Sequence, residues 1–162
     1  MARGEKTRPT ILRDTREQLA LDQFFSPAVR VEVTTIGTGD YTLKGYSSQL
    51  AVERKNLQDL THCCGHDRDR FMDQMRRMAD YRVRLLVIEA DEAEVVAGAY
   101  RSRIDWKSVV GAVRAAQMDY GVAAYWTGKH QKDAARLIEW VCLRMVRKSD
   151  IYRCEEPELL EA

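Results

Sequence analysis

The sequence predicts an α/β fold: a single domain of three layers, in which a mixed sheet carries helices on both faces. Strand-like runs alternate with helix-like segments through the second half of the chain, the order typical of helix-covered sheets. Residues 83–90 form a nearly continuous apolar run, which suits a central strand covered on both sides. The length of 162 residues allows one domain with a sizeable core and is too short for two ordinary ones.

The composition indicates a folded protein outside the membrane. Apolar residues make up 45% of the chain and charged residues 31%, which excludes a disordered chain. No run approaches the roughly 18 apolar residues that a membrane span needs. The four cysteines follow no evenly spaced pattern, so reduced thiols are the simpler interpretation. We therefore expect a soluble cytoplasmic protein.

Three segments are expected along the chain: a flexible basic arm (1–9), the folded domain (10–150) and an acidic tail (151–162). The net charge is +1, and the acidic tail leaves the rest of the chain mildly basic. That charge is compatible with DNA binding but does not by itself indicate it.

The first half of the chain predicts four strands and a short helix. Residues 10–14 form an apolar run that ends in charge, as a first strand does, and residues 17–25 suggest a short helix. Valines alternate with polar residues over 29–33, the period of a half-buried strand. Residues 41–44 and 49–55 then resemble the two arms of a hairpin.

Helical spacing becomes prominent after that hairpin. Asn56 begins a short helical segment, residues 62–67 are expected to form a loop, and apolar residues recur at helical spacing over 71–79. A strand over 83–90 and a short helix over 91–99 follow.

The end of the domain repeats this alternation. Asp105 can cap a helix over residues 106–120, and Gly121 is placed to end it. A last strand over 122–126 precedes a helix whose apolar stripe runs over 134–145.

A chemical site is indicated where the hairpin arms meet. Side chains two apart on a strand share a face, so Glu53 and Lys55 point the same way and Arg54 the other. Asp40 stands at the start of the neighbouring arm, from which its carboxylate can reach toward Glu53. Two carboxylates beside a lysine suit a hard cation such as Mg²⁺ or Mn²⁺ and the water that the cation activates.

Taken alone, these residues have ordinary explanations. A Glu-x-Lys pair on a strand is usually a solvated surface, and an aspartate after a glycine is usually a turn residue. The extended pattern is more specific: G-D-x(n)-E-R-K-x(3)-D resembles the signature of the XPF-type structure-specific endonucleases, a branch of the restriction-endonuclease-like PD-(D/E)XK nucleases. The matching residues are Gly39, Asp40, Glu53, Arg54, Lys55 and Asp59.

The resemblance extends over about 140 residues. Residues 13–17 are similar to the opening V-D-x-R-E of the family, with Arg13 in place of its apolar residue. Residues 68–81, with Gln74 inside, and 85–89 resemble the helix and strand that follow the motif, and residues 122–148 fit the final strand and helix.

The resemblance implies a restriction-endonuclease-like fold and an endonuclease that uses Mg²⁺ or Mn²⁺ to hydrolyse DNA at branched, flap or fork structures. It further implies that Asp40 and Glu53 hold the metal, that Asp14 completes the acidic cluster and that Lys55 assists the water. The residues expected to support the site or contact DNA are Arg16, Glu17, Arg54, Asp59, Arg70 and Gln74.

Some of these residues have two open interpretations. Arg54 either contacts DNA or anchors the fold by pairing with a carboxylate across the sheet. Asp59 either acts in the site or serves only as a local helix cap.

The cluster of His62, Cys63, Cys64 and His66 could bind zinc or form a mobile loop near the DNA path. The loop is favoured, because adjacent cysteines rarely ligate one zinc and no second Cys/His pair stands at finger-like spacing.

The expected partners also follow from the resemblance. The family dimerises through its nuclease domain, so we expect a homodimer in which the final helix, with Trp140, takes part. Family members commonly carry a helix-hairpin-helix module, which these 162 residues lack, so a separate DNA-binding partner is possible. The absence also leaves the preferred DNA structure open and suggests a bacterial, phage or archaeal source. The alternative functions are a catalytically silent nuclease-like subunit that grips DNA, and an accessory whose nuclease acts only within a complex.

Overall fold

The computed structural model describes residues 8–152, which form a mixed six-stranded sheet with helices on both faces. The strand order is β2-β1-β3-β4-β5-β6. Strand β3 is antiparallel to both of its neighbours, and the other pairs are parallel. The strands are β1 (Thr10–Asp14), β2 (Arg30–Thr34), β3 (Tyr41–Leu43), β4 (Leu50–Asn56), β5 (Val83–Glu89) and β6 (Ala123–Trp126).

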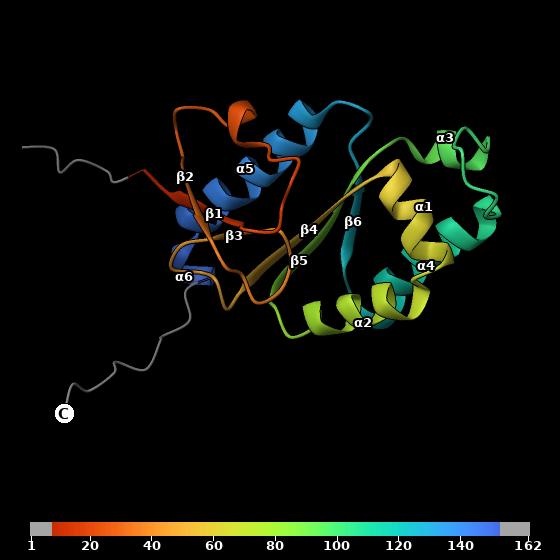
Figure 1. Cartoon of the computed structure of the whole chain (residues 1–162). Helices are drawn as coiled ribbons and strands as arrows, with labels where there is room; N and C mark the ends of the chain where they lie inside the picture. Colours follow the sequence, from red (N-terminus) through yellow and green to blue (C-terminus); the bar gives the residue numbers. More distant parts are fainter. Residues whose placement is uncertain (1–7, 153–162) are drawn as a thin grey trace, which may run out of the picture.

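The helices lie in two outer layers. Helix α5 covers one face of the sheet, while α1, α2 and α4 gather on the other (Figure 1). No helix within residues 8–152 is long and apolar enough to cross a membrane. The helical elements are η1 (Asp22–Phe24), α1 (Leu57–Gly65), α2 (Arg68–Met78), α3 (Glu92–Val96), α4 (Trp106–Tyr120), α5 (Gln131–Arg147) and α6 (Ser149–Tyr152).

Alternation along the central strands divides the core in two. Leu85 and Val87 of β5 pack toward α5, whereas Leu86 and Ile88 pack toward α1, α2 and α4. Because both sets are buried, β5 is apolar almost throughout, as its sequence predicted. The predicted three-layer α/β class is confirmed.

The predicted boundaries of α4 are also confirmed. Asp105 caps its first turn, with Oδ1 accepting from the Lys107 N–H at 2.9 Å. Gly121 ends it in the left-handed conformation, at φ 64°.

The predicted helix over residues 17–25 is wrong, since only the short turn η1 forms there. The backbone of this segment bonds to side chains from other elements instead of to itself. The Leu19 carbonyl accepts from Arg54 at 2.6 Å, and the Leu21 N–H donates to the Tyr41 hydroxyl at 3.0 Å. These tertiary bonds replace the helical ones.

The predicted loop over residues 62–67 is likewise largely helix, because α1 continues to Gly65. Leu60 and Cys64, one turn apart, are both buried against the sheet and hold this part of α1 in place.

Candidate active site

Gly39 allows Asp40 to approach β4 closely. The φ of Gly39 is +86°, and a Cβ built on it would lie 2.6 Å from the Val52 carbonyl oxygen. The same Val52 carbonyl accepts a hydrogen bond from the Asp40 N–H at 2.7 Å. The Asp40 carboxylate then accepts from the Arg54 N–H at 2.8 Å, through Oδ2. The Gly-Asp pair is therefore a geometric requirement for placing this carboxylate beside β4.

Glu53 and Lys55 lie on one face of β4, as predicted. The Lys55 ammonium is 2.7 Å from Glu53 Oε1. The other oxygen, Oε2, accepts a hydrogen bond from the Gln74 amide of α2. Glu53 is only 2% exposed, so Lys55 and Gln74 fix its orientation from two sides.

The electrostatics of these three groups differ from those of surface side chains. Burial raises the pKa of Asp40 to about 7, and repulsion from Glu53 adds to the effect. Burial also raises the pKa of Glu53. For Lys55, burial acts downward, but attraction to Glu53 outweighs it and holds the pKa above its usual value. The Lys55 ammonium therefore lies beside buried carboxyl groups, and the negative charge of these groups is poorly solvated.

The carboxyl groups fit a divalent cation. Mg²⁺ typically binds through one or two carboxylates and keeps several waters. Asp40 Oδ1 forms no hydrogen bond with residues 8–152, so it remains available as a ligand. Asp40, Glu53 and Lys55 line a groove of about 250 Å³, which leaves room for those waters.

Helix α2 forms the opposite wall of this groove. Arg70, Gln74 and Arg77 are spaced i, i+4 and i+7, so they lie on one helical face. Arg70 and Gln74 were predicted site residues, and Arg77 was not. Arg77 lies seven residues after Arg70, and this helical spacing in the sequence could have identified it as a residue of the same face.

Asp14 does not join Asp40 and Glu53. It is 1% exposed, and Oδ1 accepts from the N–H and Nε of Arg16, at 2.8 and 2.7 Å. Oδ2 accepts from the Ile36 N–H at 2.7 Å. The hydrogen bond from Arg16 lowers the pKa of Asp14 to about 2. Within residues 8–152 no three His, Cys, Asp or Glu side chains are grouped to hold a metal, so the expected acidic cluster is not formed.

Comparisons with known proteins agree with this arrangement. The model of the ERCC4 domain matches residues 13–140. The chain belongs to the ERCC4-domain family. The solved structure of XPF from Aeropyrum pernix superposes on this ERCC4 domain with a TM-score of 0.69 at 28% identity, covering 88% of this chain and 68% of that one. The XPF from Aeropyrum pernix in complex with DNA gives a TM-score of 0.64 at 25% identity, over 88% and 66% of the two chains. A comparison with curated protein sequences found no match. The resemblance to XPF-type nucleases is confirmed.

Arg54 of the ERCC4 domain anchors the fold. Its side chain is 4% exposed and donates to Glu89 Oε2 across the sheet at 3.0 Å. It also lies 3.3 Å from Glu17 Oε1. Of the two open interpretations, the structure confirms the anchor, and it assigns Glu17 to the same ion-pair network.

Asn56 caps the start of α1, and Asp59 is its hydrogen-bond partner. Its N–H donates to Asn56 Oδ1 at 2.8 Å, and Asn56 Nδ2 donates back to Asp59 Oδ2 at 2.7 Å. Asp59 also lines a recess of about 320 Å³ with Arg16, Asp40 and Lys55. Asp59 thus orients the capping residue Asn56 and is not the cap itself, and its role in the ERCC4 site remains a prediction.

The four residues of the His/Cys cluster point in different directions around α1. Cys64 is buried in the core, and Cys63 lines a recess of about 280 Å³ beside Lys55 and Gln74. The rings of His62 and His66 lie 5.5 Å apart between centroids, one helical turn from each other. The cluster therefore does not converge on one point.

Proposed function

We propose that this ERCC4 domain is an endonuclease that hydrolyses DNA phosphodiester bonds with Mg²⁺ or Mn²⁺. Asp40 and Glu53 are assigned to the metal and Lys55 to the attacking water. The convergence of these three side chains in one groove is the observation that carries the proposal. Branched, flap or fork DNA is proposed as the substrate because the XPF-type relatives are structure-specific nucleases.

Each protein group has a defined task in this mechanism. A divalent ion at Asp40 and Glu53 would polarise the phosphate and lower the pKa of a bound water. The Arg54 N–H orients Asp40, and the Gln74 amide orients Glu53. The Lys55 ammonium stabilises negative charge that develops as water attacks in line. Loss of the 3′ oxygen then leaves a 5′-phosphate and a 3′-hydroxyl.

Asp14 is proposed as a positioning residue. Its carboxylate holds Arg16, whose guanidinium also donates to the Ile36 carbonyl at 3.0 Å. The Asp14 N–H donates to the Asp40 carbonyl at 2.8 Å. Asp14 thus ties both Arg16 and the metal-binding loop to the end of β1.

Arg70 and Arg77 are proposed to bind the phosphates next to the cleaved bond. Neither side chain forms a hydrogen bond or ion pair with the described part of the chain, and both line the groove. Cations at such positions neutralise phosphates and fix the register of the strand.

The proposal is tested with labelled flap, fork and duplex DNA, with and without Mg²⁺ or Mn²⁺. Asp40→Ala and Lys55→Ala should each abolish cleavage while DNA binding persists. Asp119→Ala, which removes an exposed carboxylate from α4, is the control and should cut normally. Unchanged cleavage in either active-site variant would refute the assignment.

The alternative function is a silent DNA-binding subunit. It is disfavoured because Asp40, Glu53 and Lys55 are all retained in one groove, which DNA binding alone does not require. A wild-type protein that binds flap DNA and never cuts it, with either metal, would favour this alternative. Cutting that appears only on adding a partner would instead indicate an accessory nuclease.

A homodimer is proposed on the basis of the family and of the exposed face of α5. Trp140 on that helix is 60% exposed, which is unusual for a side chain with so much apolar surface. Light scattering at micromolar concentration should give the mass of two chains, and Trp140→Arg should give one. A monomeric wild type would contradict the proposal.

A further inference from the structure

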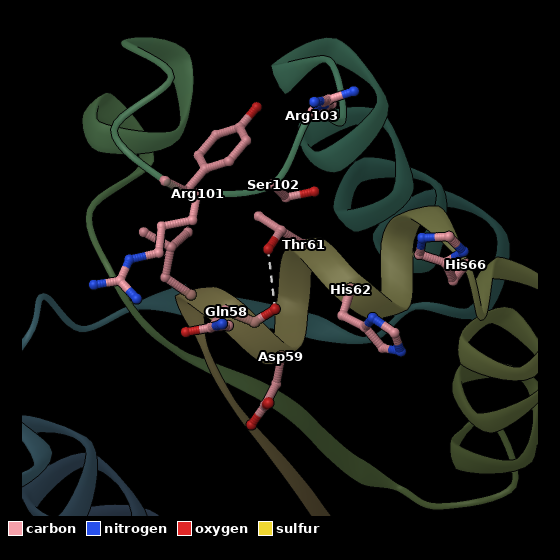
Figure 2. Close-up of a pocket in the computed structure, with 10 residues that line it drawn as sticks. Gln58, Asp59, Thr61, His62, His66, Arg101, Ser102 and Arg103 are labelled. Carbon is pink, nitrogen blue, oxygen red and sulfur yellow. Dashed lines mark hydrogen bonds between the residues drawn. The ribbon is translucent and has the colours of Figure 1, made fainter.

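A second cavity lies outside the metal groove, between α1 and the loop that joins α3 to α4. Its volume is about 890 Å³. Figure 2 shows Gln58, Thr61, His62 and His66 along α1, with Arg101, Ser102 and Arg103 on the loop above them. We propose that this cavity is a strand-binding site, in which Arg101 and Arg103 hold the sugar-phosphate backbone of a DNA strand that continues from the metal groove. The inference rests on the proposed function.

The cavity adjoins the metal site, because α1 residues line both the cavity and the recesses beside that site. Asp59 lines both the cavity and the recess that contains Asp40 and Lys55. One turn further along α1, His62 lines both the cavity and the recess beside Lys55 and Gln74. A strand that leaves the metal groove along α1 would therefore reach the cavity.

The charge of the lining favours a polyanion. Arg101 and Arg103 are exposed and form no hydrogen bond or ion pair with residues 8–152. By contrast Arg114 of α4, which does not line the cavity, lies 3.4 Å from Glu92. Asp59 is the one carboxylate among the lining residues, and Asn56 already donates to it. The lining thus carries two guanidinium groups without a partner among the described residues and one carboxylate, which already accepts a hydrogen bond from Asn56.

The remaining lining groups suit a sugar-phosphate chain. Gln58 and His62 add hydrogen-bonding groups, and Leu57 and Tyr100 add apolar surface. The Tyr100 hydroxyl donates to the Ile104 carbonyl at 2.8 Å, which holds the ring against the loop. Figure 2 shows Arg101 and Arg103 extending in different directions on either side of Ser102. Two cations spread apart, with apolar surface nearby, fit successive phosphates of one strand better than a single small anion.

The test compares two double variants of equal charge. Arg101→Ala/Arg103→Ala removes the cavity cations, and Arg114→Ala/Arg136→Ala removes two exposed arginines that are paired elsewhere. Binding of flap DNA is measured by fluorescence anisotropy, with Ca²⁺ in place of Mg²⁺, over a range of salt concentrations. The cavity variant should raise the dissociation constant by about tenfold and reduce the salt slope of log K by about 1.4 to 1.8 relative to the control.

Two further measurements separate strand binding from a folding role. Arg101→Lys/Arg103→Lys keeps the charge and should restore most of the affinity. The single-turnover cleavage rate at saturating DNA should match that of the wild type. Equal dissociation constants and salt slopes for the cavity and control variants would overturn the strand site.

The two proposals fail differently. If the wild type never cuts DNA but the cavity variant still loses affinity and salt slope, the strand site stands and the nuclease assignment fails. If the wild type cuts and the cavity variant binds as the control does, only the strand site fails.

Discussion

Replacing Asp40 with Asn should stabilise the metal-free protein while abolishing cleavage. Asp40 lies beside Glu53, and burial and this repulsion raise its pKa to about 7. Asn removes the charge but keeps an oxygen that can accept from the Arg54 N–H. The substitution therefore relieves repulsion without leaving that donor unsatisfied.

The magnitude follows from the pKa of Asp40. A rise from 3.8 to about 7 corresponds to at most about 4 kcal/mol of destabilisation once the carboxyl group is fully ionised. We expect a net gain of about 1 to 3 kcal/mol, because the Asn amide must also be desolvated. The pKa of Asp40 is higher in the folded state than in the unfolded state. The destabilisation by the ionised carboxylate is therefore absent below pH 4, grows between pH 4 and 7 and is complete above pH 7.

The assay is urea unfolding in EDTA at pH 5 and pH 8. Asp40→Asn should be more stable than the wild type at pH 8, and the difference should shrink at pH 5. Adding Mg²⁺ should stabilise the wild type and leave the variant unchanged, because a ligand stabilises only the state that binds it. Asp119→Asn serves as the control. A variant no more stable than the wild type at pH 8 in EDTA would refute the reasoning.

Three further substitutions test the supporting residues. Arg54→Met should cost about 3 to 5 kcal/mol in urea unfolding, because it leaves Glu89 buried and unpaired; a loss below 1 kcal/mol would contradict the anchor. Gly39→Ala should destabilise by about 2 kcal/mol or more and slow cleavage, since φ is +86° and the β4 backbone is in the way; normal activity would count against it. In anisotropy titrations Arg77→Ala should lower the salt slope of DNA binding by about 1, whereas Arg76→Ala, paired with Asp73, should leave it unchanged.

Local rules predicted the part of the site that lies within one strand. Glu53 and Lys55 share a face because strand side chains alternate, and that spacing is legible in the sequence. The extended apolar run of β5 likewise predicted a strand buried on both faces, although β5 lies next to the edge strand β6 and not at the centre of the sheet. These features depend only on neighbours along the chain.

The misplaced features depend on contacts between distant segments. Residues 19 and 21 are held outside a helix by Arg54 and Tyr41, which lie on other strands. Asp14 matches the family pattern by residue type, yet Arg16 and the Ile36 N–H occupy its oxygens. The type of a residue does not show which polar groups will form its hydrogen bonds and ion pairs once the chain has folded.

The ion pairs around β4 explain why the sequence motif includes charged residues that are not assigned to the metal or to the water. Arg16 pairs with Asp14, Lys55 with Glu53, and Arg54 with both Glu17 and Glu89. Together with Asp40, five carboxyl groups therefore meet three cations.

This imbalance is costly at a poorly solvated site, and a divalent ion would remove it. Arg70 and Arg77 also line the groove, but both are exposed, so phosphates would compete for them. The motif residues that do no chemistry thus offset part of the negative charge around the site. The remaining negative charge is concentrated on Asp40 and Glu53, where a cation is needed.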